Sequence, residues 1–188
     1  MNVQSASSAK GEITLSAESF NTDIRHKVAP VQQSFNIRPG DNAVEMELPM
    51  GKDFLTWDEF SPALYKLTTT LSNGKQTDTK QVQFGMRDFK IEGKWFYVNG
   101  RKTMLRGTVE NCDFPLTGYA PMDVASWERV FRICRSYGLN HMRFHSFCPP
   151  EAAFIAADLV GFYLQPEGPS WPNHGPRLGN GQPIDKYL

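Results

Sequence analysis

The stretch "GLNHMRFHSFCPPEAAFIAADLVGFYLQPEGPSW", residues 138–171, decides the fold of the second half of this chain. It opens with one short strand pattern, "LNHMRF", and closes on another, "FYLQPE". Between them, "PPEAAFIAADLVG" has proline at its start and glycine at its end, which is the polarity expected of a short helix. A strand, a helix and a strand with short links form a βαβ unit, so the two strands are predicted to be parallel.

The segment before this unit is predicted to be another helix. Asp123 can cap its first turn and Gly138 can end it. Its apolar side chains recur at the i, i+3, i+4, i+7 spacing of one helical face: Trp127, Val130, Phe131 and Cys134. The chain after Gly107 is therefore expected to alternate between strand and helix.

The first half of the chain has a different pattern. Up to about Phe84, period-2 or β-branched segments predict short strands: "EITLSAES", "VQQSFNI", "AVEMELP", "LYKLTTTL" and "KQVQFG". The links "RPGDN" and "SNGK" contain the residues that turns favour. This spacing predicts an antiparallel β-sandwich. A hairpin follows, because Asn99-Gly100 between "KWFYV" and "RKTML" suits a type I′ turn.

Composition excludes several classes of function. The 20 basic and 20 acidic residues cancel, so attraction to nucleic acid or to an anionic membrane is not expected. The sequence contains no apolar run of the roughly 20 residues that a membrane helix needs. The first residues, "MNVQSASSAKGE", are polar and show no apolar signal core. The three cysteines lack CxxC spacing, which favours free thiols over a metal or redox site.

Chemistry-bearing side chains gather at the ends of the two predicted parallel strands. His141, Arg143 and His145 alternate along one strand and so share a face. His145 and Glu167 lie at carboxyl ends of strands, where parallel α/β folds bind ligands. Burying the three cationic or cationisable groups would be costly without carboxylates or hydroxyls to meet them. Two interpretations remain open: a pocket for a polyhydroxyl ligand, or an Arg–Glu pair that braces the strands.

Four motifs add a family resemblance. They are Trp57-x4-Pro62-x-Leu64-Tyr65, Gly85-Met86-Arg87, the segment from Asn99 to Gly107, and Asn140-x-x-Arg143. In this order, over roughly residues 55–171, they resemble glycoside hydrolase family 2, which contains β-galactosidases, β-glucuronidases and β-mannosidases. The resemblance implies an immunoglobulin-like β-sandwich over residues 1–84, followed over residues 85–188 by the N-terminal part of a (β/α)8 TIM barrel, truncated here.

The resemblance also implies a reaction, the retaining hydrolysis of β-glycosides by two glutamates on later barrel strands. One of these glutamates usually follows an asparagine, and the chain contains no Asn-Glu dipeptide. The catalytic pair is therefore expected outside this chain, and the chain alone is expected to be inactive. The partner implied is a carbohydrate substrate.

Six residues are candidates for substrate binding, five from the resemblance and Trp171 from its place past a strand end: Asn111, Asp113, Arg143, His145, Glu167 and Trp171. Asn111 and Asp113 follow the first barrel strand, where relatives often have Asn-x-His-Glu. Arg143 corresponds to an arginine near the nucleophile, and Glu167 to an acidic residue at the end of the third strand. Trp171 is placed to stack on a sugar ring.

One departure from the family pattern leaves a choice open. Relatives often read Arg-x-Ser-His, whereas this chain reads Arg143-Phe144-His145-Ser146, so either His145 or Ser146 could face the sugar. Metal-using relatives have Glu-x-His where this chain has Trp171-Pro172-Asn173, and no metal or other cofactor is implied.

The alternative function is a non-catalytic carbohydrate-binding or structural β-sandwich module. A truncated barrel would also leave a sheet edge and apolar faces uncovered, which predicts self-association. A periplasmic or secreted location is expected for the full-length protein rather than a cytoplasmic one.

Overall fold

The computed structural model describes residues 2–168, and the chain divides into two compact units. The first unit comprises Met1–Trp57 and Ala63–Arg87. The second comprises Asp58–Pro62 and Asp88–Leu188. The pentapeptide Asp58–Pro62 is thus interposed in the sequence of the first unit but packs as part of the second.

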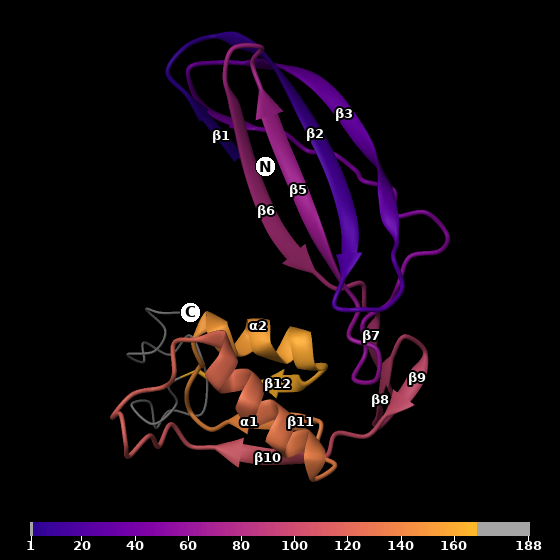
Figure 1. Ribbon diagram of the computed structural model, residues 1–188, viewed down its shortest axis with the longest axis vertical. Coiled ribbons are helices and arrows are strands. Elements are labelled where there is room, and N and C mark those ends of the chain that lie inside the picture. The colour runs from indigo at the N-terminus through magenta and orange to yellow at the C-terminus, as the bar shows by residue number, and fades with distance from the viewer. Residues whose placement is uncertain (1, 169–188) are drawn as a thin grey trace. The chain divides into compact units, whose positions relative to one another are not determined.

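The first unit is built on a four-stranded antiparallel sheet in the order β3-β2-β5-β6 (Figure 1). Its strands are β2 (Ala9–Phe20), β3 (Lys27–Ile37), β5 (Leu64–Ser72) and β6 (Thr77–Phe84). A smaller antiparallel pair joins β1 (Asn2–Ser5) to β4 (Gly40–Ala43). The described part of this unit contains no helix, as the period-2 pattern predicts.

One predicted strand of the first unit is wrong. The segment "AVEMELP", residues 43–49, forms no strand beyond Ala43 at the end of β4. Its alternation is real, because Leu48 and Met50 are half-buried and pack against the core of the sheet, whereas Glu45 and Glu47 are exposed. Pro49 has no backbone N–H to donate to a ladder. The alternation of apolar and polar residues in this segment therefore reflects packing against the sheet rather than pairing as a strand.

Tyr65 is the centre of the first unit's core. It is fully buried beside Ala17 and Val28. Its hydroxyl accepts a hydrogen bond from the Leu55 backbone N–H at 2.8 Å and lies 2.8 Å from His26 Nδ1. The hydroxyl thereby ties the irregular segment that precedes Trp57 to the sheet, which explains why a tyrosine suits this buried position.

The second unit begins with a three-stranded antiparallel meander, β7 (Phe89–Glu92), β8 (Trp95–Val98) and β9 (Arg101–Thr103). The turn between β8 and β9 contains Asn99 at φ 50° and Gly100 at φ 73°. Positive φ at both central residues is the requirement of a type I′ turn. The Asn-Gly hairpin prediction is confirmed.

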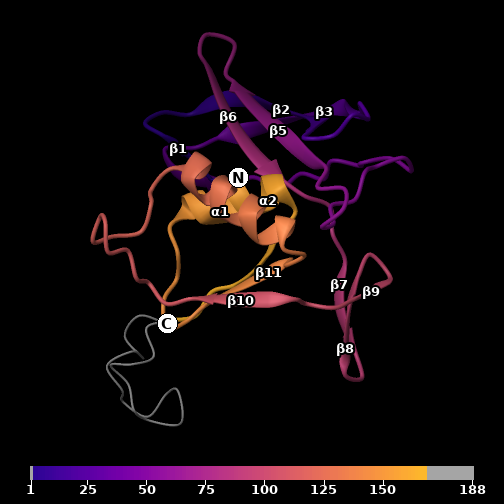
Figure 2. The ribbon, with the colours of Figure 1, turned by 60° about the horizontal axis from the view of Figure 1, so that its bottom comes forward.

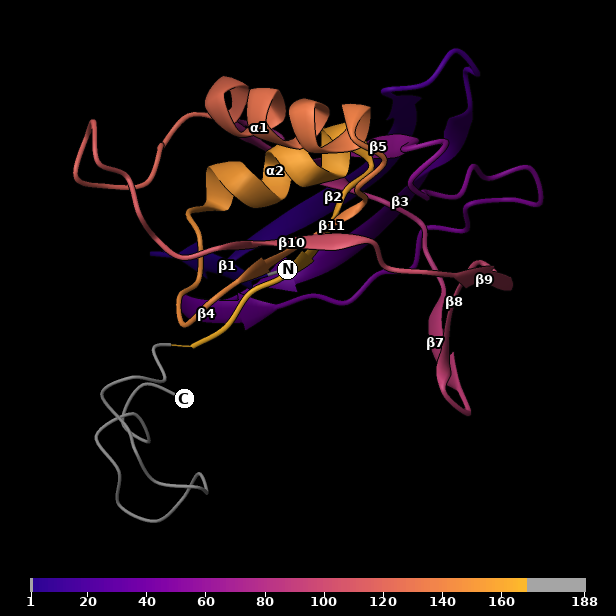
Figure 3. The same ribbon diagram turned by 90° about the horizontal axis from the view of Figure 1, so that it is seen from below.

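A parallel three-stranded sheet follows, in the order β10-β11-β12. Its elements run β10 (Gly107–Glu110), α1 (Val124–Ser136), β11 (His141–Phe144), α2 (Glu151–Val160) and β12 (Tyr163–Gln165). Both helices cover the same face of this sheet (Figures 2 and 3). The predicted βαβ connections are confirmed.

The helices begin and end at the residues that the sequence indicates. Asp123 Oδ1 accepts the Ser126 backbone N–H at 2.8 Å at the start of α1, and Gly138 follows its end in a left-handed conformation with φ 79°. Gly161 takes the same role after α2, with φ 77°. No helix of residues 2–168 is long and apolar enough to cross a membrane.

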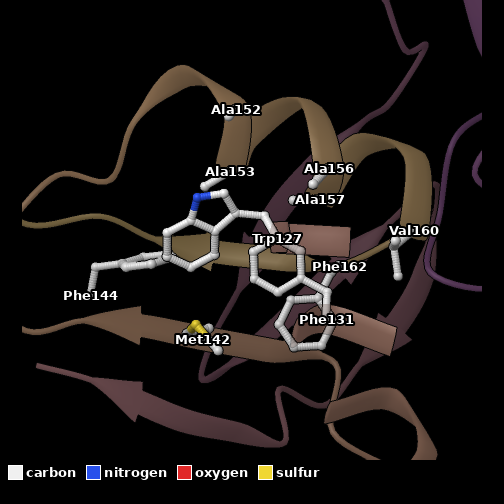
Figure 4. Packing of buried hydrophobic residues seen from close by; sticks show 10 residues of the cluster. All are labelled: Trp127, Phe131, Met142, Phe144, Ala152, Ala153, Ala156, Ala157, Val160 and Phe162. Carbon is white, nitrogen blue, oxygen red and sulfur yellow. The ribbon is translucent and has the colours of Figure 1, made fainter. Parts of the chain in front are cut away.

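An aromatic and alanine-rich core fills the space between the helices and the sheet (Figure 4). Trp127 and Phe131 of α1 lie with ring centroids 5.8 Å apart, and Phe131 stacks on Phe162 at 4.9 Å. The small side chains of α2 contribute the rest of its buried face: Ala152, Ala153, Ala156 and Ala157. Met142 and Phe144 of β11 point into this core, so the intervening Arg143 faces the other way.

Candidate functional site

The candidate site lies at the carboxyl ends of β10, β11 and β12. Arg143 is paired in register with Val109 of β10 and Gln165 of β12, so these three side chains share the face opposite the helices. That face is the one left uncovered by α1 and α2 (Figure 3). Parallel sheets bind ligands at this end, because loops rather than strands continue beyond it.

Arg143 and Glu167 form a two-point ion pair. Arg143 Nε donates to Glu167 Oε1 at 2.5 Å, and Nη2 donates to Oε2 at 3.2 Å. The side chains remain 42% and 23% exposed, so a ligand could reach the pair. The hydrogen bond from Arg143 lowers the pKa of the Glu167 carboxyl, and the same bond raises the pKa of the guanidinium. Glu167 is therefore held as a carboxylate.

A backbone group completes the environment of Glu167. The Ser146 N–H donates to Glu167 Oε2 at 2.9 Å, which lowers the pKa of the carboxyl further. Ser146 has φ 65°, a left-handed conformation that is uncommon for residues other than glycine. The backbone N–H of Glu167 in turn donates to Phe147 O at 3.1 Å. The chain after β11 is thus fastened to the chain after β12.

His145 is held from the neighbouring strand. Its backbone N–H donates to Glu110 O at 2.8 Å, and its ring Nδ1 lies 3.1 Å from Asn111 Oδ1. An amide oxygen can only accept, so the imidazole donates here in the tautomer that is protonated on Nδ1. The structure therefore joins His145 to Asn111, and it joins the backbone of Ser146 to Glu167.

The loop after β10 is shaped by Glu110. Its Oε1 accepts the backbone N–H groups of Cys112 at 2.8 Å and Asp113 at 3.3 Å. Cys112 takes a left-handed φ of 60° in this turn. Glu110 is the last residue of β10 and is paired with Phe144, so it shares the helix side of the sheet rather than the face of Arg143.

The structure brings together four of the six predicted site residues, as two contacting pairs: Arg143 with Glu167, and His145 with Asn111. Within the described residues, no hydrogen bond or ion pair joins the exposed Asp113 side chain to either pair. Trp171 lies outside the described residues. The Ser146 N–H is a further part of the candidate site. The spacing of residues in the sequence does not indicate it, because its position depends on the left-handed backbone of Ser146.

His141 lies two residues before Arg143 on the same face and is half-buried. Its Nδ1 is 2.4 Å from the place where a Cβ on Gly107 would stand, so a larger residue at position 107 would force the imidazole to shift. Burial lowers the pKa of His141. The glycine of the Arg106-Gly107 motif is thus explained by the half-buried imidazole that packs over it.

This arrangement can bind and orient polar groups but lacks one part of a glycosidase centre. Retaining hydrolysis needs two carboxylates about 5 Å apart. In the part of the chain that the structure describes, Glu167 is the carboxylate beside Arg143, and it is already paired. The same residues hold no cluster of three His, Cys, Asp or Glu side chains suited to a metal ion.

Comparison with known families gives this geometry a context. The model of the glycosyl hydrolases of family 2 matches residues 1–87. Residues 1–87 belong to glycoside hydrolase family 2. The match ends at the residue where the first unit of the structure ends. Similarity to individual relatives extends beyond these residues.

Among curated relatives, a β-galactosidase from Thermoanaerobacterium thermosulfurigenes is 29% identical over 64% of the chain. A putative β-glucuronidase from Formosa agariphila is 29% identical over 81% of it. The crystal structure of Parabacteroides merdae β-glucuronidase superposes on 86% of the chain with a TM-score of 0.68 and 26% identity. The chain spans about a fifth of these proteins, 17%, 18% and 20% of their respective lengths.

Proposed function

We propose that this chain contributes one wall of the substrate pocket of a retaining β-glycosidase. Residues 1–84 would form the immunoglobulin-like sandwich, and residues 85–188 the first strands and helices of a (β/α)8 barrel. The glutamate pair would lie outside this chain. The observation that carries the proposal is the Arg143–Glu167 pair beside His145 and Asn111, at the carboxyl ends of parallel strands, in a chain with family 2 relatives.

Arg143 would act electrostatically. A guanidinium within about 4–6 Å of a carboxylate lowers the pKa of that carboxylate, which keeps a nucleophilic glutamate ionised at neutral pH. Glu167 fixes the plane of the guanidinium through two hydrogen bonds, so Arg143 is held in place before substrate arrives. Its remaining N–H groups would meet the incoming carboxylate or a sugar hydroxyl.

The sugar would be contacted by four side chains: Asn111, His145, Asp113 and Trp171. The Asn111–His145 contact fixes the imidazole, and Asp113 stands two residues further along the same loop. The substrate would be a β-glycoside, since the relatives bear the names β-galactosidase and β-glucuronidase. Their common chemistry is a pyranoside with a β-linked leaving group.

The test uses the complete gene product that contains this chain. It is incubated with chromogenic β-galactoside, β-glucuronide and β-mannoside, and the anomer released first is identified by proton NMR. The proposal expects hydrolysis of at least one substrate with release of the β-anomer. Saturable binding of these sugars without hydrolysis would favour the non-catalytic carbohydrate-binding module instead, and release of the α-anomer would contradict the retaining mechanism.

A further inference from the structure

A second polar cluster lies at the opposite end of the parallel sheet, around the pentapeptide Asp58–Pro62. Glu59 is only 6% exposed and Asn140 is 1% exposed. Asn140 Nδ2 lies 3.0 Å from both Glu59 Oε1 and Oε2, and Arg106 Nη2 donates to Oε2 at 3.3 Å. A carboxylate is therefore buried among donors that come from two other parts of the second unit.

Asn140 ties the start of β10 to the start of β11. Its Oδ1 accepts the backbone N–H of Arg106 at 2.7 Å, and its Nδ2 also donates to Met104 O at 3.0 Å. Arg106 directly precedes β10, and Asn140 directly precedes β11. The Glu59 carboxylate thus orients the Asn140 side-chain amide, and this amide holds the start of β10 in register with the start of β11.

The third strand is reached through the backbone of Glu59. Arg135 Nη1, at the end of α1, donates to Glu59 O and to Gly161 O, both at 2.7 Å. A Cβ on Gly161 would stand 2.9 Å from Glu59 O. Tyr163, which opens β12, donates its N–H to Asn140 O at 2.9 Å. One residue of the pentapeptide therefore contacts groups at the amino ends of all three parallel strands.

We propose that Glu59 is a positioning residue for the glycoside pocket, an inference that rests on the proposed function. It aligns the amino ends of β10, β11 and β12, and so sets the separations of the groups that follow their carboxyl ends, Asn111, His145 and Glu167. A parallel strand that slips by one residue turns every side chain to the other face, which would move Arg143 into the helix-side core.

The chemistry of a buried carboxylate supports an alignment role. Desolvation of such a group offsets most of its attraction to a cation, so a buried ion pair adds little net stability compared with an apolar replacement. The carboxylate does impose direction, because each oxygen accepts hydrogen bonds only from donors in defined positions. Glu59 meets donors from Asn140 and Arg106, and these residues directly precede β11 and β10.

The test compares Glu59→Gln with Glu128→Gln in the 188-residue chain. Glu128 is a matched control, because it also loses a carboxylate paired with an arginine, Arg132 at 2.9 Å on α1. The readouts are the ¹H–¹⁵N resonances of Arg143 Nε and of the His145 ring, and the exchange of the Arg143 Nε–H with solvent. Glu59→Gln is expected to shift both sets of resonances and to speed the exchange about fivefold, the equivalent of losing one hydrogen bond. Glu128→Gln should leave them unchanged.

A folded Glu59→Gln variant with unchanged Arg143 and His145 resonances would overturn the proposal, even if the variant melts at a lower temperature. If Glu59→Gln does not fold, Arg106→Gln decides on the same readouts. It removes the 3.3 Å contact to Glu59, together with the bonds from Arg106 to Gly138 O and Met104 O, and leaves the bonds from Asn140 to Glu59 in place. These spectra need no hydrolysis. A failure of the alignment role would therefore appear in these spectra. A failure of the proposed reaction would appear in the hydrolysis assay of the complete gene product.

Discussion

Arg143 and Glu167 face each other across the carboxyl ends of β11 and β12, joined at 2.5 Å and 3.2 Å, with the Ser146 N–H on the same carboxylate. This pair was expected from the sequence at these two strand ends, and the geometry confirms the pairing. It fastens two loops at the edge of the sheet where a ligand would bind. Three donors on one carboxylate also make the pair sensitive to pH.

Glu167→Gln should lower stability at neutral pH and much less in acid. The pKa of Glu167 is lowered in the folded chain, chiefly by the hydrogen bond from Arg143. Its contribution is therefore present above the unfolded pKa of about 4.3 and is lost as the pH falls through the folded value. Urea unfolding of both forms from pH 7 to pH 3 checks this. A difference that stays constant over that range would show that the charge of Glu167 contributes nothing.

Arg143→Ala should lower turnover by about 100-fold in the complete gene product, because it removes a charge that acts on the reacting groups. Its melting temperature should fall only modestly, because the substitution removes the partly exposed ion pair with Glu167 but creates no cavity in the core. Arg132→Ala is the control, since Arg132 also pairs with a glutamate, Glu128, but on α1 away from the strand ends. Turnover and thermal unfolding are measured on the same preparations. A collapse of the melting temperature with unchanged activity per folded molecule would make Arg143 a structural brace.

Gly107→Ala should destabilise the second unit by about 1–3 kcal/mol, the usual cost of overpacking. The added methyl would lie 2.4 Å from His141 Nδ1. In a His141→Ala background the same methyl has room, so the two substitutions should be strongly non-additive. A double-mutant cycle by chemical denaturation measures the coupling. Additive effects would mean that His141 does not occupy this space.

Tyr65→Phe should destabilise the first unit by about 1–2 kcal/mol, because it leaves the partly buried Leu55 N–H without its acceptor. It should also remove the hydrogen-bond partner of His26, whose Nδ1 lies 2.8 Å from the hydroxyl. Tyr137→Phe removes a hydroxyl from a tyrosine that is 81% exposed and serves as the control. Equal stability changes in the two variants would argue against this hydrogen-bond network.

Much of the second unit could be predicted from local sequence. Asp123 and Gly138 bound α1, the run "PPEAAFIAADLVG" gives α2, and Asn99-Gly100 gives the hairpin, because each rests on the conformational preference of one or two residues. Residues 43–49 could not be assigned in this way. A half-buried segment alternates whether it pairs as a strand or packs across a sheet, and only long-range contacts separate the two cases.

The candidate site was partly predictable for a similar reason. Arg143 and Glu167 follow from strand periodicity and parallel topology. The bond from the Ser146 N–H and the turn that Glu110 caps include positive φ angles at Ser146 and Cys112, which no local residue preference demands. Glu59 was missed because it sits between Trp57 and Pro62 in the sequence of the other unit. Its role appears only when Asn140, 81 residues away, lies beside it.

The central claim is that this chain holds pocket residues but no catalytic carboxylate pair. The most direct measurement incubates the purified 188-residue chain and its Glu167→Gln variant with chromogenic β-galactoside, β-glucuronide and β-mannoside, alongside the complete gene product. The account predicts hydrolysis by the complete product and none by either form of the chain, because loss of a catalytic carboxylate costs several powers of ten in rate. Turnover by the chain that disappears in Glu167→Gln would show a complete catalytic site within these residues and would contradict the account.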